Sequence, residues 1–282
     1  MTQTLQDGAR SATPISLLPR RIVIGLDGSL FSERSLPVAS DLAGAIDADL
    51  MLLSVVEYPG EWHARASYLD RLHRSYRARM VALLVEPDAR RALARRLPDE
   101  LLCLATRGRT AIIRSVLGSV AFSEVAAGHP SLLVGFACAR PVLDRPVAIA
   151  VGGGVPFDAA VAIAASWAAK LGVTVEVISA AVGARDANSV DAEHAVNALT
   201  GLGVHATATV LTVGQDPIDT VARWLRHRPP SLLVAPTTLN SGEARALLHS
   251  QVADLVGQVD VPVLAVPSRR LAGPDRPSPA PD

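Results

Sequence analysis

The chain has 282 residues, of which 49% are hydrophobic, and its formal net charge at pH 7 is zero. This length suggests one large domain or two domains of about 140 residues each. The apolar content supplies a core and argues against disorder along the whole chain, and the neutral charge argues against a protein built to coat nucleic acid or an anionic membrane.

We expect no targeting signal and no membrane span. The first twenty residues lack the basic and apolar stretches of a signal peptide, and residues 1–19 are predicted to be a disordered segment. The most apolar segment, residues 159–169, is too short to span a bilayer. Two cysteines and seven scattered histidines indicate neither a disulfide framework nor a metal site, and Cys103 is expected to be a buried apolar residue. These features predict a soluble protein in the reducing cytoplasm.

The sequence contains an internal repeat. Shifted along itself, the chain aligns residues 22–56 with residues 147–181 without a gap. Each segment has a β-branched run, a glycine-rich turn, a helical stretch and a second β-branched run. A second match pairs LLCLAT at 101–106 with LLVAPT at 232–237. Two copies of one long unit explain both matches most simply.

Within the first copy, a strand from residue 22 is followed by a predicted helix. Its apolar residues Leu36, Ala39, Ala43 and Ile46 recur at helical spacing and predict one buried stripe. After a second strand comes the arginine-rich stretch 62–79. A nucleic-acid site would need a larger positive field and a recognisable motif, so a solvated helical face is the better interpretation.

A third strand is predicted at 80–86 in the first copy and at 204–212 in the second. Each is followed by an acidic residue, a proline and a helical stretch, and Asp216-Pro217 is a good start for such a helix. Apolar strands that alternate with helices imply a parallel sheet covered on both faces.

The predicted fold class is α/β, with two tandem, doubly wound, Rossmann-like sheets of five parallel strands each. The strand order is either 2-1-3-4-5 or 3-2-1-4-5, and both orders place strand one beside the ligand-binding crevice. The predicted domains are residues 20–138 and 145–268, separated by a linker at 139–144 and followed by a disordered tail at 269–282.

Two loops with glycines face that crevice. GLDGS at 25–29 follows the first strand, and ATRGRT at 105–110 follows the fourth. Gly108 tolerates a positive φ and lets a ligand approach the backbone closely. Gly118-Ser119 opens a helical stretch whose free N–H groups suit a phosphate. The spacing therefore predicts two backbone cradles at opposite ends of one loop.

Asp27 is suited to accept hydrogen bonds from ribose hydroxyls or to help hold Mg²⁺. Asp27-Gly28-Ser29 also fits a plain strand-to-helix turn with a capping serine. Its combination with the glycine spacing favours a nucleotide site.

This arrangement resembles the nucleotide-binding members of the universal stress protein family, which carry an aspartate after strand one and the motif G-x2-G-x9-G-[S/T] after strand four. The motif in this chain is A-T-R-G-x9-G-S, with Ala105 in place of the first glycine. The opening IVIGLDGS, the strand-two LLSVVE and the later LGSV also match. The resemblance covers residues 20–268 and is that of a tandem member. Because alanine keeps its N–H and is small, weakened or altered binding is expected rather than loss.

The resemblance implies that the first domain binds ATP or a related adenine nucleotide, with Mg²⁺, and that adenine rests on the backbone of Val55. It implies a regulatory role in the stress response, in which the nucleotide orders the 105–119 loop and so changes an exposed surface. Arg107 and Arg109 either complement phosphates or decorate an exposed loop. The implied nucleotide-binding residues are Leu26, Asp27, Gly28, Ser29, Val55, Ala105, Arg107, Gly108, Arg109, Gly118, Ser119 and Val120.

The second copy has lost the matching residues, because Asp27 corresponds to Gly152 and Gly118-Ser119 to Ser250-Gln251. It is predicted to be scaffold. A rival hypothesis is an interaction module in which both sites have decayed and no nucleotide binds. The sequence has no P-loop, no dinucleotide fingerprint and no nucleophile elbow, and slow ATP hydrolysis would have no dedicated base, so the chain is not predicted to be an enzyme.

Members of this family pair through their last strands. We therefore expect an internal pseudo-twofold interface between residues 131–136 and residues 262–267. Dimerisation of whole chains is a further alternative. The predicted partners are an adenine nucleotide and a protein of unknown identity, with no nucleic acid and no membrane.

Overall fold

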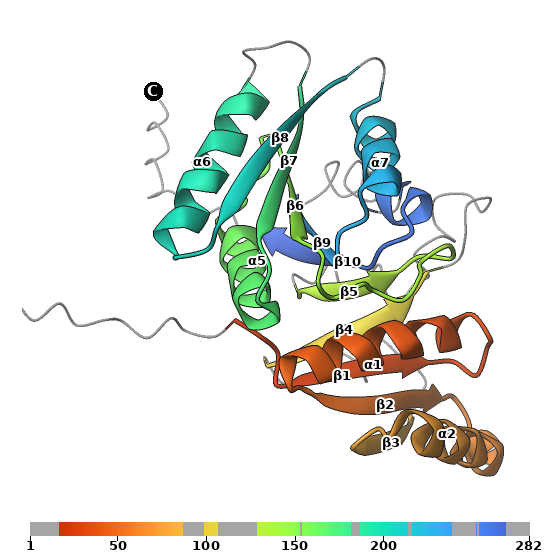
Figure 1. Cartoon of the computed structure of the whole chain (residues 1–282). Coiled ribbons are helices and arrows are strands. Elements are labelled where there is room, and N and C mark those ends of the chain that lie inside the picture. The colour runs from red at the N-terminus through yellow and green to blue at the C-terminus, as the bar shows by residue number, and fades with distance from the viewer. Residues whose placement is uncertain are drawn as a thin grey trace, which may run out of the picture.

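The structure is a computed structural model of the whole chain. It describes residues 17–86, 99–106, 129–152, 154–181, 187–213, 216–238, 252 and 254–268. Figure 1 shows the first half of the chain, in red to yellow, against the second half, in green to blue, with α5 beside α1 near their junction.

Strands and helices alternate in both halves, as the sequence predicts. In the first half, two short 3-10 turns, η1 and η2, each precede a longer helix. The elements of the first half are β1 Arg21–Leu26, η1 Ser32–Arg34, α1 Ser35–Ile46, β2 Asp49–Val56, η2 Pro59–Glu61, α2 Trp62–Tyr76, β3 Met80–Val85, β4 Glu100–Ala105 and β5 Ser131–Val134. Those of the second half are β6 Val147–Val151, α5 Asp158–Leu171, β7 Val175–Ala181, α6 Ala187–Gly201, β8 Ala206–Thr212, α7 Pro217–His227, β9 Leu232–Thr238 and β10 Val263–Ser268.

The ten strands in the described residues form one sheet, in the order β3-β2-β1-β4-β5-β10-β9-β6-β7-β8. Of the two strand orders that the sequence left open, each half has 3-2-1-4-5. The register repeats as well, since Leu26 lies opposite Ser54 and Val151 lies opposite Ser179. This agreement supports the duplication inferred from the sequence.

The two halves are joined where β5 and β10 pair antiparallel, with Leu133 opposite Val263 and Leu132 opposite Leu264. This is the predicted pairing of the last strands. It also merges the two expected sheets of five into one continuous sheet, because each buried strand satisfies its open edge with the other. Beside the junction, Lys170 at the end of α5 forms an ion pair with Asp47, which follows α1.

Helices cover the sheet on both faces. The larger apolar core lies beneath α1, α2, α5 and α6 and contains Ile24, Leu36 and the fully buried Trp167. The core on the other face receives Leu225 from α7 and Val256 from helical residues 254–258. A doubly wound sheet needs this cover, because its strands are apolar on both sides.

Several local expectations hold in the described residues. The stripe of Leu36, Ala39, Ala43 and Ile46 is buried along α1. Helix α7 begins at Pro217, and the Asp216 carboxylate accepts a hydrogen bond from the Ile218 N–H at 2.9 Å. Cys103 is fully buried within β4, as are its neighbours Leu102 and Leu132. No helix among the described residues is long and apolar enough to cross a membrane.

Candidate functional site

The predicted site residues that the structure describes gather at the carboxyl ends of three neighbouring parallel strands. Leu26 lies opposite Ser54 of β2, and the register of β1 with β4 brings Ala105 to the same level. Asp27 and Val55 each lie one residue beyond this level. The strands on either side of β1 are reached by crossovers in opposite directions, and in open α/β sheets this is where ligands bind.

The turn after β1 is organised around the carboxylate of Asp27. Its Oδ1 atom accepts hydrogen bonds from the Ser29 N–H at 2.9 Å and the Ser29 hydroxyl at 2.6 Å. Ser32 joins the turn to η1, because its hydroxyl donates to the Ser29 carbonyl oxygen at 2.9 Å. Asp27 and Gly28 are exposed, so this compact turn presents the carboxylate to solvent.

These hydrogen bonds fix the charge of the turn. Partial burial acts to raise the pKa of the Asp27 carboxyl, but the hydrogen bonds from Ser29 and Ser32 outweigh it, and the pKa lies below its ordinary value of 3.8. The group is an ionised carboxylate at neutral pH. Such a group accepts hydrogen bonds from hydroxyls and coordinates hard cations.

The strand ends beneath the turn are held by buried hydroxyl and amide groups. The Ser54 hydroxyl donates to the Leu26 carbonyl oxygen at 2.6 Å, and the Thr106 N–H donates to the Val134 carbonyl oxygen at 2.8 Å. Ser54 and Thr106 were not among the predicted site residues. Their signal was present in the sequence, because both lie in the stretches LLSVVE and LLCLAT on which the repeat and the resemblance rest.

A residue of α2 also reaches this turn. Gly28 has φ +84°, and a Cβ atom added there would lie only 2.4 Å from Nη1 of Arg65. The guanidinium of Arg65 therefore rests against the backbone of the turn. Sequence reasoning missed Arg65, because it treated the arginines of 62–79 as one solvated face.

The other predicted contacts cannot be placed against this turn. Arg107, Gly108 and Arg109, together with Gly118-Ser119 and Val120, lie outside the described residues. Their roles as phosphate cradles and loop cations stay predictions.

The corresponding edge of the second half has the same frame without the acid. Ser179 and Thr237 occupy the places of Ser54 and Thr106, and both are buried. Gly152 stands where Asp27 stands in the first half, and its φ is +124°. No carboxylate projects from that position.

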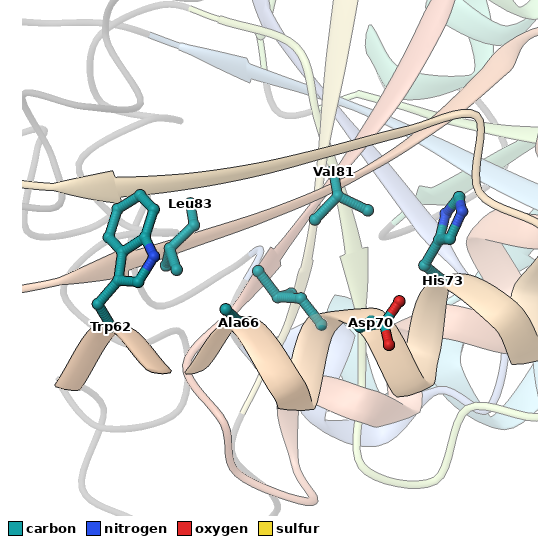
Figure 2. Close-up of a pocket in the computed structure, with 7 residues that line it drawn as sticks. Trp62, Ala66, Asp70, His73, Val81 and Leu83 are labelled. Carbon is teal, nitrogen blue, oxygen red and sulfur yellow. The ribbon is translucent and has the colours of Figure 1, made fainter. Parts of the chain in front are cut away.

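A groove lies between α2 and the terminal strand β3, with a volume of about 280 Å³. Figure 2 shows Trp62 and Leu83 at one end of it and His73 at the other. The groove is mainly apolar, and Asp70 on its rim forms an ion pair with Arg74. None of its lining residues belongs to the Asp27 turn, so the groove is separate from the candidate site.

No protein-family model matches the chain, and no curated protein matches it by sequence. Solved structures do match. A universal stress protein from Archaeoglobus fulgidus DSM 4304 is similar at 13% identity and a TM-score of 0.70, covering 88% of this chain and 98% of its own. A protein of unknown function from Pseudomonas aeruginosa PAO1 is similar at 16% identity and a TM-score of 0.59, covering 88% of this chain and 92% of its own.

The cytoplasmic domain of a prokaryotic cation chloride cotransporter is similar at 13% identity and a TM-score of 0.51, covering 88% of this chain and 95% of its own. These matches span both halves of the chain. The chain therefore has the universal stress protein fold in its two-domain form, as the sequence resemblance implied. Because the same fold occurs within a transporter, the fold alone does not assign a function.

Proposed function

We propose that this chain is a universal stress protein-like regulatory module that binds an adenine nucleotide in its first domain, residues 20–138. The observation that carries the proposal is the Asp27 carboxylate, held ionised and exposed at the point where the winding of the sheet reverses. In this proposal the second domain, residues 145–268, is scaffold, because it presents Gly152 in the same place.

Asp27 is proposed to accept hydrogen bonds from the ribose hydroxyls. The end of β2 lies next to it, and the backbone of Val55 is proposed to meet the adenine ring, as the family resemblance implies. ATP with Mg²⁺ is the proposed form of the ligand. Mg²⁺ is proposed to be held by the phosphates and by water, because this ion keeps several waters and needs few protein ligands.

The regulatory part of the proposal concerns the segment after β4. Ala105 closes that strand at the level of Leu26, so Thr106 lies beside the candidate site. Nucleotide bound there is proposed to order the 105–119 loop and alter the surface that a partner protein reads in the cytoplasm. A homodimer of whole chains would need a surface other than β5 and β10, because these strands already pair with each other.

The test is nucleotide binding measured by isothermal titration calorimetry. We expect MgATP to bind, and Asp27→Asn to weaken binding by about tenfold or more, because an amide cannot replace a charged acceptor. The asparagine still accepts the hydrogen bonds from Ser29, so the turn is retained. The matched control is Asp216→Asn, which makes the same change at the start of α7 in the second half.

The control variant should bind MgATP as the wild type does. Absence of binding to the wild type, or an equal loss in both variants, would contradict the proposal and favour the interaction module with two decayed sites. Adenine nucleotide released on denaturing the protein purified from cells would support it independently.

A further inference from the structure

Helix α2 places one guanidinium directly over the Asp27 turn. A Cβ atom on Gly28 would lie 2.4 Å from Nη1 and 2.9 Å from Cζ of Arg65, both too close for any real side chain. The positive φ of Gly28 already favours glycine. The turn and the guanidinium therefore fit together only because this position has no side chain.

Arg65 differs from the other arginines of the same helix in its partners. Arg71 forms an ion pair with Glu33 at 3.2 Å, and Arg74 forms one with Asp70 at 2.6 Å. Nη1 of Arg65 is buried and has no hydrogen-bond partner in the described part of the chain. Its Cζ atom lies 5.9 Å from the centroid of the Tyr68 ring.

A buried guanidinium nitrogen without an acceptor is unfavourable, because its donors have lost water and gained nothing in return. Arginine cannot relieve this by losing its proton. Burial together with the charge of Glu33 raises the pKa of Tyr68 to about 12, so the neighbouring phenol stays neutral and supplies no negative charge. An anionic ligand would supply the missing acceptor.

We propose that Arg65 is a binding residue of the candidate site and donates hydrogen bonds to a phosphate of the bound nucleotide. The inference rests on the proposed function and assigns the two sides of the turn to two parts of one ligand. The Asp27 carboxylate accepts from sugar hydroxyls and repels phosphate, whereas the guanidinium attracts phosphate and matches its geometry. The pair selects a nucleoside phosphate over a free nucleoside.

Arg65 is able to move to such a ligand at little cost. Rotation about its side-chain torsions breaks no hydrogen bond of Nη1 with the described residues, and it leaves the Asp27–Ser29 hydrogen bonds intact. Arg71 and Arg74 would each lose an ion pair in the same movement. Of the arginines of α2, Arg65 is therefore the one poised to serve a ligand.

The test compares three ligands and three variants by isothermal titration calorimetry. The ligands are ATP, adenosine and inorganic tripolyphosphate, and the variants are Arg65→Gln, Arg65→Lys and the control Arg71→Gln. We expect Arg65→Gln to weaken the binding of ATP and of tripolyphosphate by about tenfold or more. The binding of adenosine should weaken by less than about twofold. Arg65→Lys should retain part of the affinity for phosphate, because lysine keeps the positive charge but lacks the planar pair of N–H donors of a guanidinium.

Arg71→Gln removes the same charge from the same helix and should change every affinity by less than about twofold, since exposed charges act weakly at a distance. An equal loss for adenosine and ATP in Arg65→Gln would overturn the inference, because Arg65 would then support only the shape of the turn. Equal losses in Arg65→Gln and Arg71→Gln would also overturn it, as would a wild type that binds no phosphate compound. The wild type could also bind tripolyphosphate as tightly as ATP, with binding that depends on Arg65. This result would contradict the proposal of an adenine nucleotide but support the role of Arg65 in binding phosphate.

Discussion

The two halves of the molecule share one frame and differ at one edge. Their strand orders agree, and the pairing of Leu26 with Ser54 is repeated by Val151 with Ser179. At the next residue the first half presents the ionised Asp27 and the second half Gly152. The strands must keep their apolar character to fill the core, whereas the residue just beyond a strand end is free of that demand. The two halves of this duplicated fold therefore agree in the strands of the sheet and differ in the residues of the candidate site.

The difference extends to the backbone. Gly152 has φ +124°, a region that residues with a side chain rarely adopt, whereas Asp27 is not among the described residues with positive φ. Restoring an acid at position 152 would strain the second half rather than rebuild a site. The buried Ser179 and Thr237 persist there, although the Thr237 hydroxyl has no partner in the described residues. Retention of these hydroxyls alone does not mark a functional site.

The largest expected effect comes from breaking the junction that holds the halves together. Leu133 is fully buried between Leu104 of β4 and Val263 of β10. Leu133→Asp places an unpaired carboxylate there and should destabilise the protein by about 4 kcal/mol or more, a large part of the stability of a typical domain. Urea unfolding and size-exclusion chromatography measure the loss and the resulting aggregation.

The matched control makes the same substitution at Leu84 on the terminal strand β3, where the side chain is 38% exposed. Leu84→Asp should cost about 1 kcal/mol or less, because charged residues are tolerated at sheet edges. A Leu133→Asp protein that stays monomeric and unfolds in two separate steps would show that the halves are independent units.

A medium effect is expected from two glycines with similar backbones and different surroundings. Gly28 in the first half and Gly154 in the second have φ +84° and +69°, but only Gly28 has Arg65 against it. Each substitution to alanine should cost about 1 kcal/mol through the backbone alone, because the flexible end of Arg65 moves away from Gly28 at little cost. Thermal unfolding without ligand measures both.

Removing Arg65 should leave these costs unchanged. In an Arg65→Ala background, Gly28→Ala is expected to cost about as much as it does in the wild type. A much larger cost for Gly28→Ala in the wild-type background would mean that Arg65 is held in place and does not move freely to a ligand.

The smallest expected effect is the reaction of the two cysteines of the first half with a thiol reagent. Burial raises the pKa of the Cys103 thiol, and burial with the charge of Asp260 raises that of Cys138 to about 12. Since the thiolate is the reactive form, neither should react with a disulfide reagent near pH 8 in the folded protein. Both should react in concentrated urea. Rapid labelling of the native chain would contradict the raised pKa values of these thiols.

The sequence by itself determined the repeat, the alternation of strands and helices and the position of Asp27 at a strand end. These follow from local patterns, because hydrophobic periodicity and turn residues are read over a few neighbouring positions. The stripe on α1 and the Asp216 start of α7 are of this kind, and both are present. The family resemblance added the pairing of the last strands, which the structure contains.

Only the tertiary structure decided how distant segments meet. The sequence left two strand orders open, because local periodicity does not fix which strand a crossover returns to. It also gave no sign that Arg65 would lie on Gly28, since that contact joins a helix to a turn far along the chain. The periodicity of α2 shows which residues share a face, but the packing of α2 on β2, β3 and α1 decides which arginine lacks a partner. Contacts of this kind depend on how elements pack in space, and no short stretch of sequence contains both of the residues in contact.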